Sequence, residues 1–114
     1  MINLTPHSIV LRTNEGDIIY PPSGIVARVS ALPSEASVVE GIPVPVQPAP
    51  VWGEVEGLPE PQEGTLFLVS GLVLSRCVGR RDVFAPATGP KDGVIRCHEG
   101  RVAAVTRLNA APLR

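Results

Sequence analysis

The residues best suited to chemistry in this 114-residue chain are four charged side chains in its second half. Arg76, Arg80, Arg81 and Asp82 lie between apolar stretches. Guanidinium groups capture carboxylates and phosphates through paired hydrogen bonds. Because Arg76 precedes Arg80 by one helical turn, both side chains are expected to project to one side as a fork, with Asp82 orienting one of them. The pattern predicts a binding site for a small anionic, nucleotide-like ligand at Arg76, Arg80, Arg81 and Asp82.

The same four charges also have a purely structural explanation. Cations at the C-terminus of a helix interact favourably with the helix dipole. Arg81 with Asp82, or Arg80 with a glutamate, can form a surface ion pair that contributes little energy. In that case the four residues form a solvated helix end and bind no ligand. The sequence leaves both interpretations open.

Metal binding has little support in the sequence. His7 and His98 are far apart, and the neighbours Cys97 and His98 point to opposite faces of a strand. In an intracellular protein, Cys77 and Cys97 are expected to be reduced thiols that form no disulfide. We therefore expect neither a metal site nor a cofactor.

Catalysis is equally poorly supported. Ser70 lies where a predicted strand passes into a predicted helix, but no glycine stands two residues before it, as a nucleophile elbow requires. An N-cap is the expected role of Ser70. The loop 87–93 contains two glycines and Lys91, yet it matches neither a P-loop nor a dinucleotide-binding fingerprint. We expect that the protein is not an enzyme, and a small hydrolase ranks last among the functions considered.

Charge and composition exclude several classes of protein. Ten Lys and Arg oppose eleven Asp and Glu, for a formal net charge of −1, which argues against a nucleic-acid partner held by charge. Eleven glycines and thirteen prolines interrupt the chain too often for a helical bundle. No secretory signal is visible at the start, and the apolar run 66–74 is about half the length of a membrane span. We expect a soluble intracellular domain without a membrane partner.

The elements that must position these residues are short strands. Two hairpins are predicted, one at residues 8–20 around Asn14-Glu15-Gly16 and one at residues 94–108 around His98-Glu99-Gly100. Residues 65–69 form a buried strand, and a helix over residues 71–78 places Leu72, Val73 and Cys77 inside. The predicted fold is mainly β, a small curled antiparallel sheet or partly open barrel with one short helix. It occupies residues 1–108, and residues 109–114 form a flexible tail.

The proline-rich segment 42–50 must be extended, because each proline fixes φ and removes a backbone donor. It is either a ligand for an aromatic groove or an edge strand whose Ile42, Val44 and Val46 face the core. The regular spacing of the aliphatic residues favours the edge strand. The chain is rich in aliphatic residues for its size, so we expect a second subunit to cover the edge at residues 43–51 in a homo-oligomer, most simply a dimer.

Several motifs resemble one group of proteins. They are Asn3-Leu4-Thr5-Pro6-His7, the segment 22–29, Gly57-Leu58-Pro59-Glu60-Pro61, and the segment 68–70 followed by 81–83. With Gly100-Arg101-Val102 they resemble short proteins from bacteriophages and prophages of GC-rich bacteria. The resemblance implies a small viral accessory protein in the host bacterial cytoplasm. Phage proteins of this size often inhibit host defence, and some are oligomers that sequester nucleotide-derived signals.

Two functions follow as hypotheses. The first is a non-catalytic binder of a small anionic ligand at residues 76–82, sequestering a host-defence signal. The alternative is a virion-associated or assembly-associated interaction module that binds no small ligand. A ligand binder should be stabilised against heat by nucleotides, whereas an interaction module should not.

Overall fold

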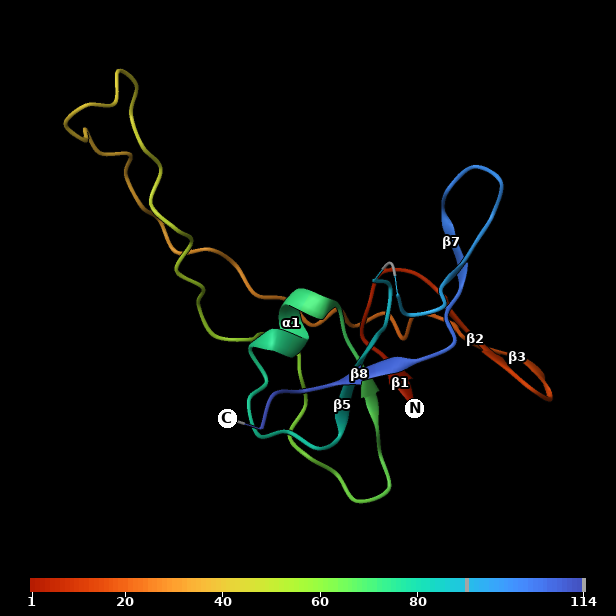
Figure 1. The fold of residues 1–114 in the computed structure, drawn as a ribbon. Coiled ribbons are helices and arrows are strands. Elements are labelled where there is room, and N and C mark those ends of the chain that lie inside the picture. Colours follow the sequence, from red (N-terminus) through yellow and green to blue (C-terminus); the bar gives the residue numbers. More distant parts are fainter. Residues whose placement is uncertain (90, 114) are drawn as a thin grey trace.

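The computed structural model describes residues 1–89 and 91–113, and it is mainly β with one short helix, as predicted (Figure 1). A four-stranded sheet has the order β1-β4-β5-β8, in which β1, β4 and β5 are parallel and β8 is antiparallel to β5. Its strands are β1 (Ile2–Asn3), β4 (Phe67–Leu68), β5 (Val83–Pro86) and β8 (Leu108–Ala110). Within the described residues no sheet closes into a barrel.

The two hairpins predicted from turn chemistry are confirmed. The first pairs β2 (Ile9–Thr13) with β3 (Gly16–Tyr20), and Gly16 has the positive φ of 121° that favours glycine at this turn. The second pairs β6 (Ile95–Arg96) with β7 (Val102–Ala104). Val105 follows β7 and contacts β2, because its N–H donates to the Val10 carbonyl at 2.9 Å.

The buried strand predicted at residues 65–69 is confirmed around β4. Phe67, Leu68 and Val69 are fully buried, whereas Leu66 is 41% exposed. Successive side chains of a strand point to opposite faces, and both faces are covered here. Phe67 and Val69 pack in one apolar cluster and Leu68 packs in another, which explains the uninterrupted apolar run.

The helix α1 (Gly71–Ser75) is shorter than the predicted 71–78. Ser70 is its N-cap, as expected, and accepts a hydrogen bond from the Val73 N–H at 3.3 Å. Val73 and Cys77 are buried, but the prediction that Leu72 faces inward is wrong, because Leu72 is 44% exposed. A helix turns by about 100° per residue, so with Val73, Leu74 and Cys77 inward, Leu72 lies on the outer face. No helix in the described residues is long and apolar enough to cross a membrane.

The amino-terminal motif is held by a polar network in the core. The amide nitrogen of Asn3 donates to the carbonyls of His7 and Tyr20, both at 2.8 Å, while its oxygen accepts from the N–H and hydroxyl of Thr5 at 2.9 and 2.6 Å. Asn3 is only 2% exposed. A buried amide must satisfy its donors and acceptors, and Asn3 does so by joining the loop after β1 to the end of β3.

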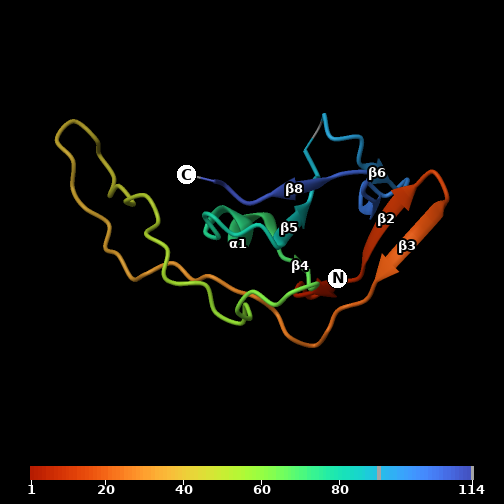
Figure 2. The same ribbon diagram turned by 90° about the horizontal axis from the view of Figure 1, so that it is seen from below.

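Residues 29–55 form an arm that extends away from the sheets (Figure 1, Figure 2). Its two extended segments run antiparallel, joined at the base by the Arg28–Glu56 bridge and further out by the Ala31–Trp52 and Ser37–Val46 bridges. The prediction that Ile42, Val44 and Val46 face the core is wrong: Ile42 and Val44 are exposed and Val46 is half-buried. Prolines cannot donate to a strand ladder, so this segment stays outside the sheets.

The carboxy-terminal residues make contacts with the sheet and the core that the sequence does not predict. Asn109 and Ala110, assigned to a flexible tail, instead belong to β8 and pair with Ala85 and Phe84 of β5. Ala111 is buried in the core cluster that contains Phe67. The small side chains in this segment show little alternation of apolar and polar residues. The position of the segment is therefore set by its pairing with the distant strand β5.

Candidate functional site

Arg80 and Asp82 form a two-point ion pair at the corner that leads into β5. The Arg80 Nε donates to one Asp82 carboxylate oxygen at 2.8 Å and a terminal nitrogen donates to the other at 2.9 Å. The same terminal nitrogen donates to the Pro59 carbonyl at 3.1 Å. The hydrogen bonds between the two side chains lower the pKa of Asp82 and raise that of Arg80. Arg80 therefore connects the loop after the arm to the sheet, and these contacts use much of its hydrogen-bond donor capacity.

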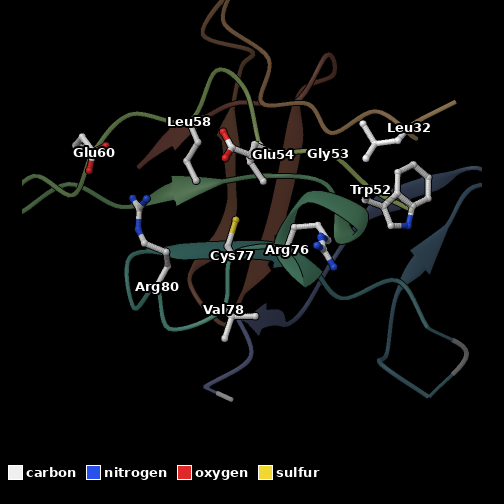
Figure 3. A pocket seen from close by; sticks show the side chains of 11 residues that line it. Leu32, Trp52, Gly53, Glu54, Leu58, Glu60, Arg76, Cys77, Val78 and Arg80 are labelled. Carbon is white, nitrogen blue, oxygen red and sulfur yellow. The ribbon is translucent and has the colours of Figure 1, made fainter. Parts of the chain in front are cut away.

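Arg76 and Arg80 line one cavity of about 750 Å³ between the base of the arm and the end of α1 (Figure 3). They do not form the expected fork. In Figure 3 the Arg76 guanidinium points to the side where Trp52 lies, and the Arg80 guanidinium points toward the side of Glu60. Helical spacing does not apply because α1 ends at Ser75, and Arg76 is its C-cap.

The other predicted site residues face a different hollow. Arg81 and Asp82 line a cavity of about 560 Å³ beside the loop at residues 61–66, and Arg80 borders both cavities. The four charges are thus divided: Arg76 lies in the first cavity and Arg81 in the second. No described contact brings Arg76 and Arg81 together.

The first cavity, which we call the arm-base cavity, combines apolar, aromatic and charged side chains. Its arm side was not identified from the sequence. The signal that could have indicated it is Trp52, the only tryptophan of the chain. Such a surface can stack a planar ring and contact an anionic group. The lining residues are Leu32, Trp52, Gly53, Glu54, Val55, Leu58, Glu60, Arg76, Cys77, Val78 and Arg80.

The cysteine in this cavity is poorly suited to nucleophilic chemistry. Burial raises the pKa of the Cys77 thiol, and the thiol donates to the Val73 carbonyl at 3.1 Å. The thiolate is the reactive form of cysteine, so this environment disfavours reaction. Both Cys77 and Cys97 are free. Among residues 1–89 and 91–113, no three His, Cys, Asp or Glu side chains cluster as metal ligands would.

A third hollow of about 430 Å³ lies between β2, the end of β5 and β7, and we call it the groove. Its floor is apolar: Ile9, Ala104 and Val105 are buried, and Val102 is 44% exposed. Arg101 contributes a cation to its lining. The full lining comprises residues 7–10, Pro86, Thr88 and residues 101–105.

The arm itself is an unusually exposed apolar surface. Every residue from 30 to 51 is exposed except Val46, which is half-buried. Val38 is 89% exposed, Val44 61% and Val51 59%. The chain exposes 8168 Å², whereas a compact monomer of this mass exposes about 6,000 Å². Its radius of gyration is 17.3 Å, against about 13 Å for a compact domain of this length.

No protein family, curated protein or solved structure matches this chain. The function is therefore inferred from the arm, the cavities and the sequence motifs.

Proposed function

We propose that this protein is a non-catalytic assembly module that joins protein chains, including copies of itself, through the arm. The observation that carries the proposal is the surface of the arm: 22 consecutive residues, 30–51, of which 21 are exposed and several are large aliphatic residues. Monomeric proteins rarely expose contiguous apolar surface on this scale, and large exposed patches mark interaction sites. The excess of about 2,000 Å² over a compact monomer is of the order that a stable interface buries.

The composition of the arm supports binding rather than a passive linker. Pro43, Pro45, Pro48 and Pro50 restrict the backbone, so less conformational entropy is lost when the arm binds. The valines between these prolines supply the apolar contact area. Three antiparallel bridges between its outgoing and returning segments hold the arm extended.

The motif resemblance provides the biological setting of the proposal. As a small phage-type protein in the host bacterial cytoplasm, the chain would act as a virion-associated or assembly-associated component. Cys77 is poorly placed for nucleophilic chemistry, and we propose no reaction for this protein.

Sedimentation velocity at micromolar concentration tests the proposal. We expect the wild-type chain to be a homo-oligomer and the double variant Val38→Asp/Val44→Asp to be a monomer with unchanged secondary structure by circular dichroism. Leu113→Asp is the matched control, because Leu113 is 66% exposed and lies outside the arm. A wild-type monomer, or an oligomer that the arm variant does not dissociate, would overturn the proposal.

A second candidate function is binding of a small anionic ligand in the arm-base cavity. It is favoured by one observation, that Arg76 and Trp52 lie toward the same side of a cavity of about 750 Å³, within the usual size of ligand sites. A nucleotide would stack its base on the indole and place phosphate near the guanidinium. In this function the protein would sequester a nucleotide-derived signal.

Thermal unfolding with ATP and with adenosine tests this candidate. We expect stabilisation by ATP and not by adenosine, and at least tenfold weaker ATP binding in Arg76→Ala, since a hydrogen bond to a charged group contributes about 1.5 to 3 kcal/mol. Arg107→Ala is the control, because Arg107 is exposed and outside the cavity. Equal stabilisation of wild type and Arg76→Ala would exclude this site.

A further inference from the structure

Charge is strongly segregated along the chain. Residues 29–75, which include the whole arm, contain six glutamates and no lysine or arginine. Residues 76–114 contain eight lysines and arginines and only three acidic residues. The small net charge of the chain therefore results from two regions of opposite sign.

The arm and the groove lie at opposite ends of the molecule. The arm extends from one side of the sheets, and the β2–β3 hairpin lies on the other side in both views (Figure 1, Figure 2). The groove is formed by β2 and β7 on that far side. The molecule is 58 Å along its longest axis, so an arm held in this orientation does not reach the groove of its own chain.

We propose that the arm of one copy binds in the groove of a second copy, which identifies the partner and docking site of the assembly function proposed above. The inference rests on that function and adds the receiving surface. Val44, between two prolines, supplies an exposed aliphatic side chain for the apolar floor near Val102. Glu35 and Glu40 of the arm meet the cation of Arg101 at the groove.

Charge complementarity selects a second copy as the occupant. The arm carries Glu35 and Glu40, and the largely apolar lining of the groove carries Arg101. Complementary charges fix both the partner and the register of an interface. Arg101 is exposed and lies beside the exposed Val102, so one location offers both the apolar contact and the cation. Because the arm and the groove are different surfaces, the contact is heterologous, and repeated contacts produce a ring or a filament unless two copies exchange arms.

Charge reversal and restoration test this docking mode. We expect Glu35→Lys/Glu40→Lys in the arm, and separately Arg101→Glu in the groove, each to weaken self-association at least tenfold in sedimentation equilibrium. The chain that carries all three substitutions should regain self-association to within about threefold of wild type, because opposite charges again face each other. Glu63→Lys and Arg107→Glu are matched controls outside the arm and the groove, and should leave association unchanged.

The outcomes separate this inference from the function on which it rests. A wild-type monomer would overturn both. An oligomer that dissociates with the arm substitutions but not with Arg101→Glu would overturn the groove assignment and leave the assembly function standing. Failure of the triple variant to recover, while it remains folded by circular dichroism, would also overturn the groove assignment.

A cross-linking measurement gives an answer that does not depend on disrupting the interface. In Val44→Cys/Cys97→Ser, the cysteine at position 44 is labelled with a benzophenone maleimide and irradiated. We expect cross-linked peptides that join position 44 of one chain to residues 7–10 or 101–105 of another. Cross-links confined to other segments, or found only within one chain, would exclude the proposed docking mode.

Discussion

The guanidinium of Arg80 donates to both carboxylate oxygens of Asp82, two residues further along the chain. The pair is mostly shielded, with side-chain exposures of 22% and 17%. Arg80 also donates to the Pro59 carbonyl, so a cation predicted to bind a ligand has a structural role, connecting a loop to the sheet. A charged residue in the turn between a helix and a strand can thus satisfy a structural requirement before it contacts any ligand.

This pair makes the stability of the protein depend on pH in the acid range. Because Arg80 lowers the pKa of Asp82, the pair contributes full stability above the ordinary aspartate pKa of 3.8 and loses it as the pH falls through the lowered value. Asp82→Asn should cost roughly 1.5 to 3 kcal/mol at neutral pH. The difference in the free energy of unfolding between the variant and the wild type should shrink once the pH falls below the ordinary aspartate pKa. Urea unfolding at a series of pH values measures this difference.

The exposed pair Arg12–Asp17 provides the comparison. Its side chains are 47% and 38% exposed, so solvent screens the interaction, and Asp17→Asn should destabilise the protein less than Asp82→Asn. Equal effects of the two substitutions would show that shielding at Asp82 is unimportant.

Alanine substitutions in and beside the central strand should destabilise the protein strongly at buried side chains and weakly at the exposed neighbour Leu66. Phe67→Ala should lower the free energy of unfolding by about 3 to 5 kcal/mol and Val69→Ala by about 2 to 4 kcal/mol, because both side chains are fully buried. Leu66→Ala should cost less than about 1.5 kcal/mol, since Leu66 is 41% exposed. Chemical denaturation measures all three, and a Leu66 effect as large as that of Phe67 would contradict the assigned strand orientation.

Asn3→Asp tests the polar network of the amino-terminal motif. The substitution removes the two N–H donors to His7 and Tyr20 and places a carboxylate against their carbonyl oxygens. We expect a loss of about 3 kcal/mol, since the change leaves buried acceptors unpaired and introduces a charge. Asn109→Asp at an exposed site is the control. If both variants melt at the wild-type temperature, the network does not stabilise the fold.

Gly57→Ala should disturb the base of the arm. Gly57 has a φ of +80°, and a Cβ there would lie 2.6 Å from the Val26 carbonyl oxygen. Gly64 has a similar φ of +74° with no atom within 4 Å of its Cβ position, so Gly64→Ala measures backbone strain alone, about 1 to 2 kcal/mol. Gly57→Ala should exceed this by at least about 1 kcal/mol in thermal or urea unfolding. Equal destabilisation by Gly57→Ala and Gly64→Ala would indicate that the backbone near Val26 relaxes freely.

The sequence alone determined the elements whose signals are local. Gly16 and Gly100 indicate the two hairpin turns because only a few residues adopt positive φ easily. Ser70 indicates the helix N-cap, and the apolar run in residues 65–69 indicates a buried strand. Each of these signals depends on residues a few positions apart, so no knowledge of distant contacts is needed.

Tertiary structure decided which distant segments meet and which remain apart. Ile2 pairs with Phe67, and Phe84 pairs with Ala110, although nothing in those short segments specifies the partner. The proline-rich segment has the alternation of an edge strand, but without N–H donors at its prolines it cannot extend the central ladder, and it becomes an exposed arm. The arm-base cavity brings Trp52 and Arg76 to one hollow because the path of the arm and the early end of α1 place them there. Such encounters depend on the summed packing of the whole chain, whereas turn and cap signals depend on a few neighbouring bonds.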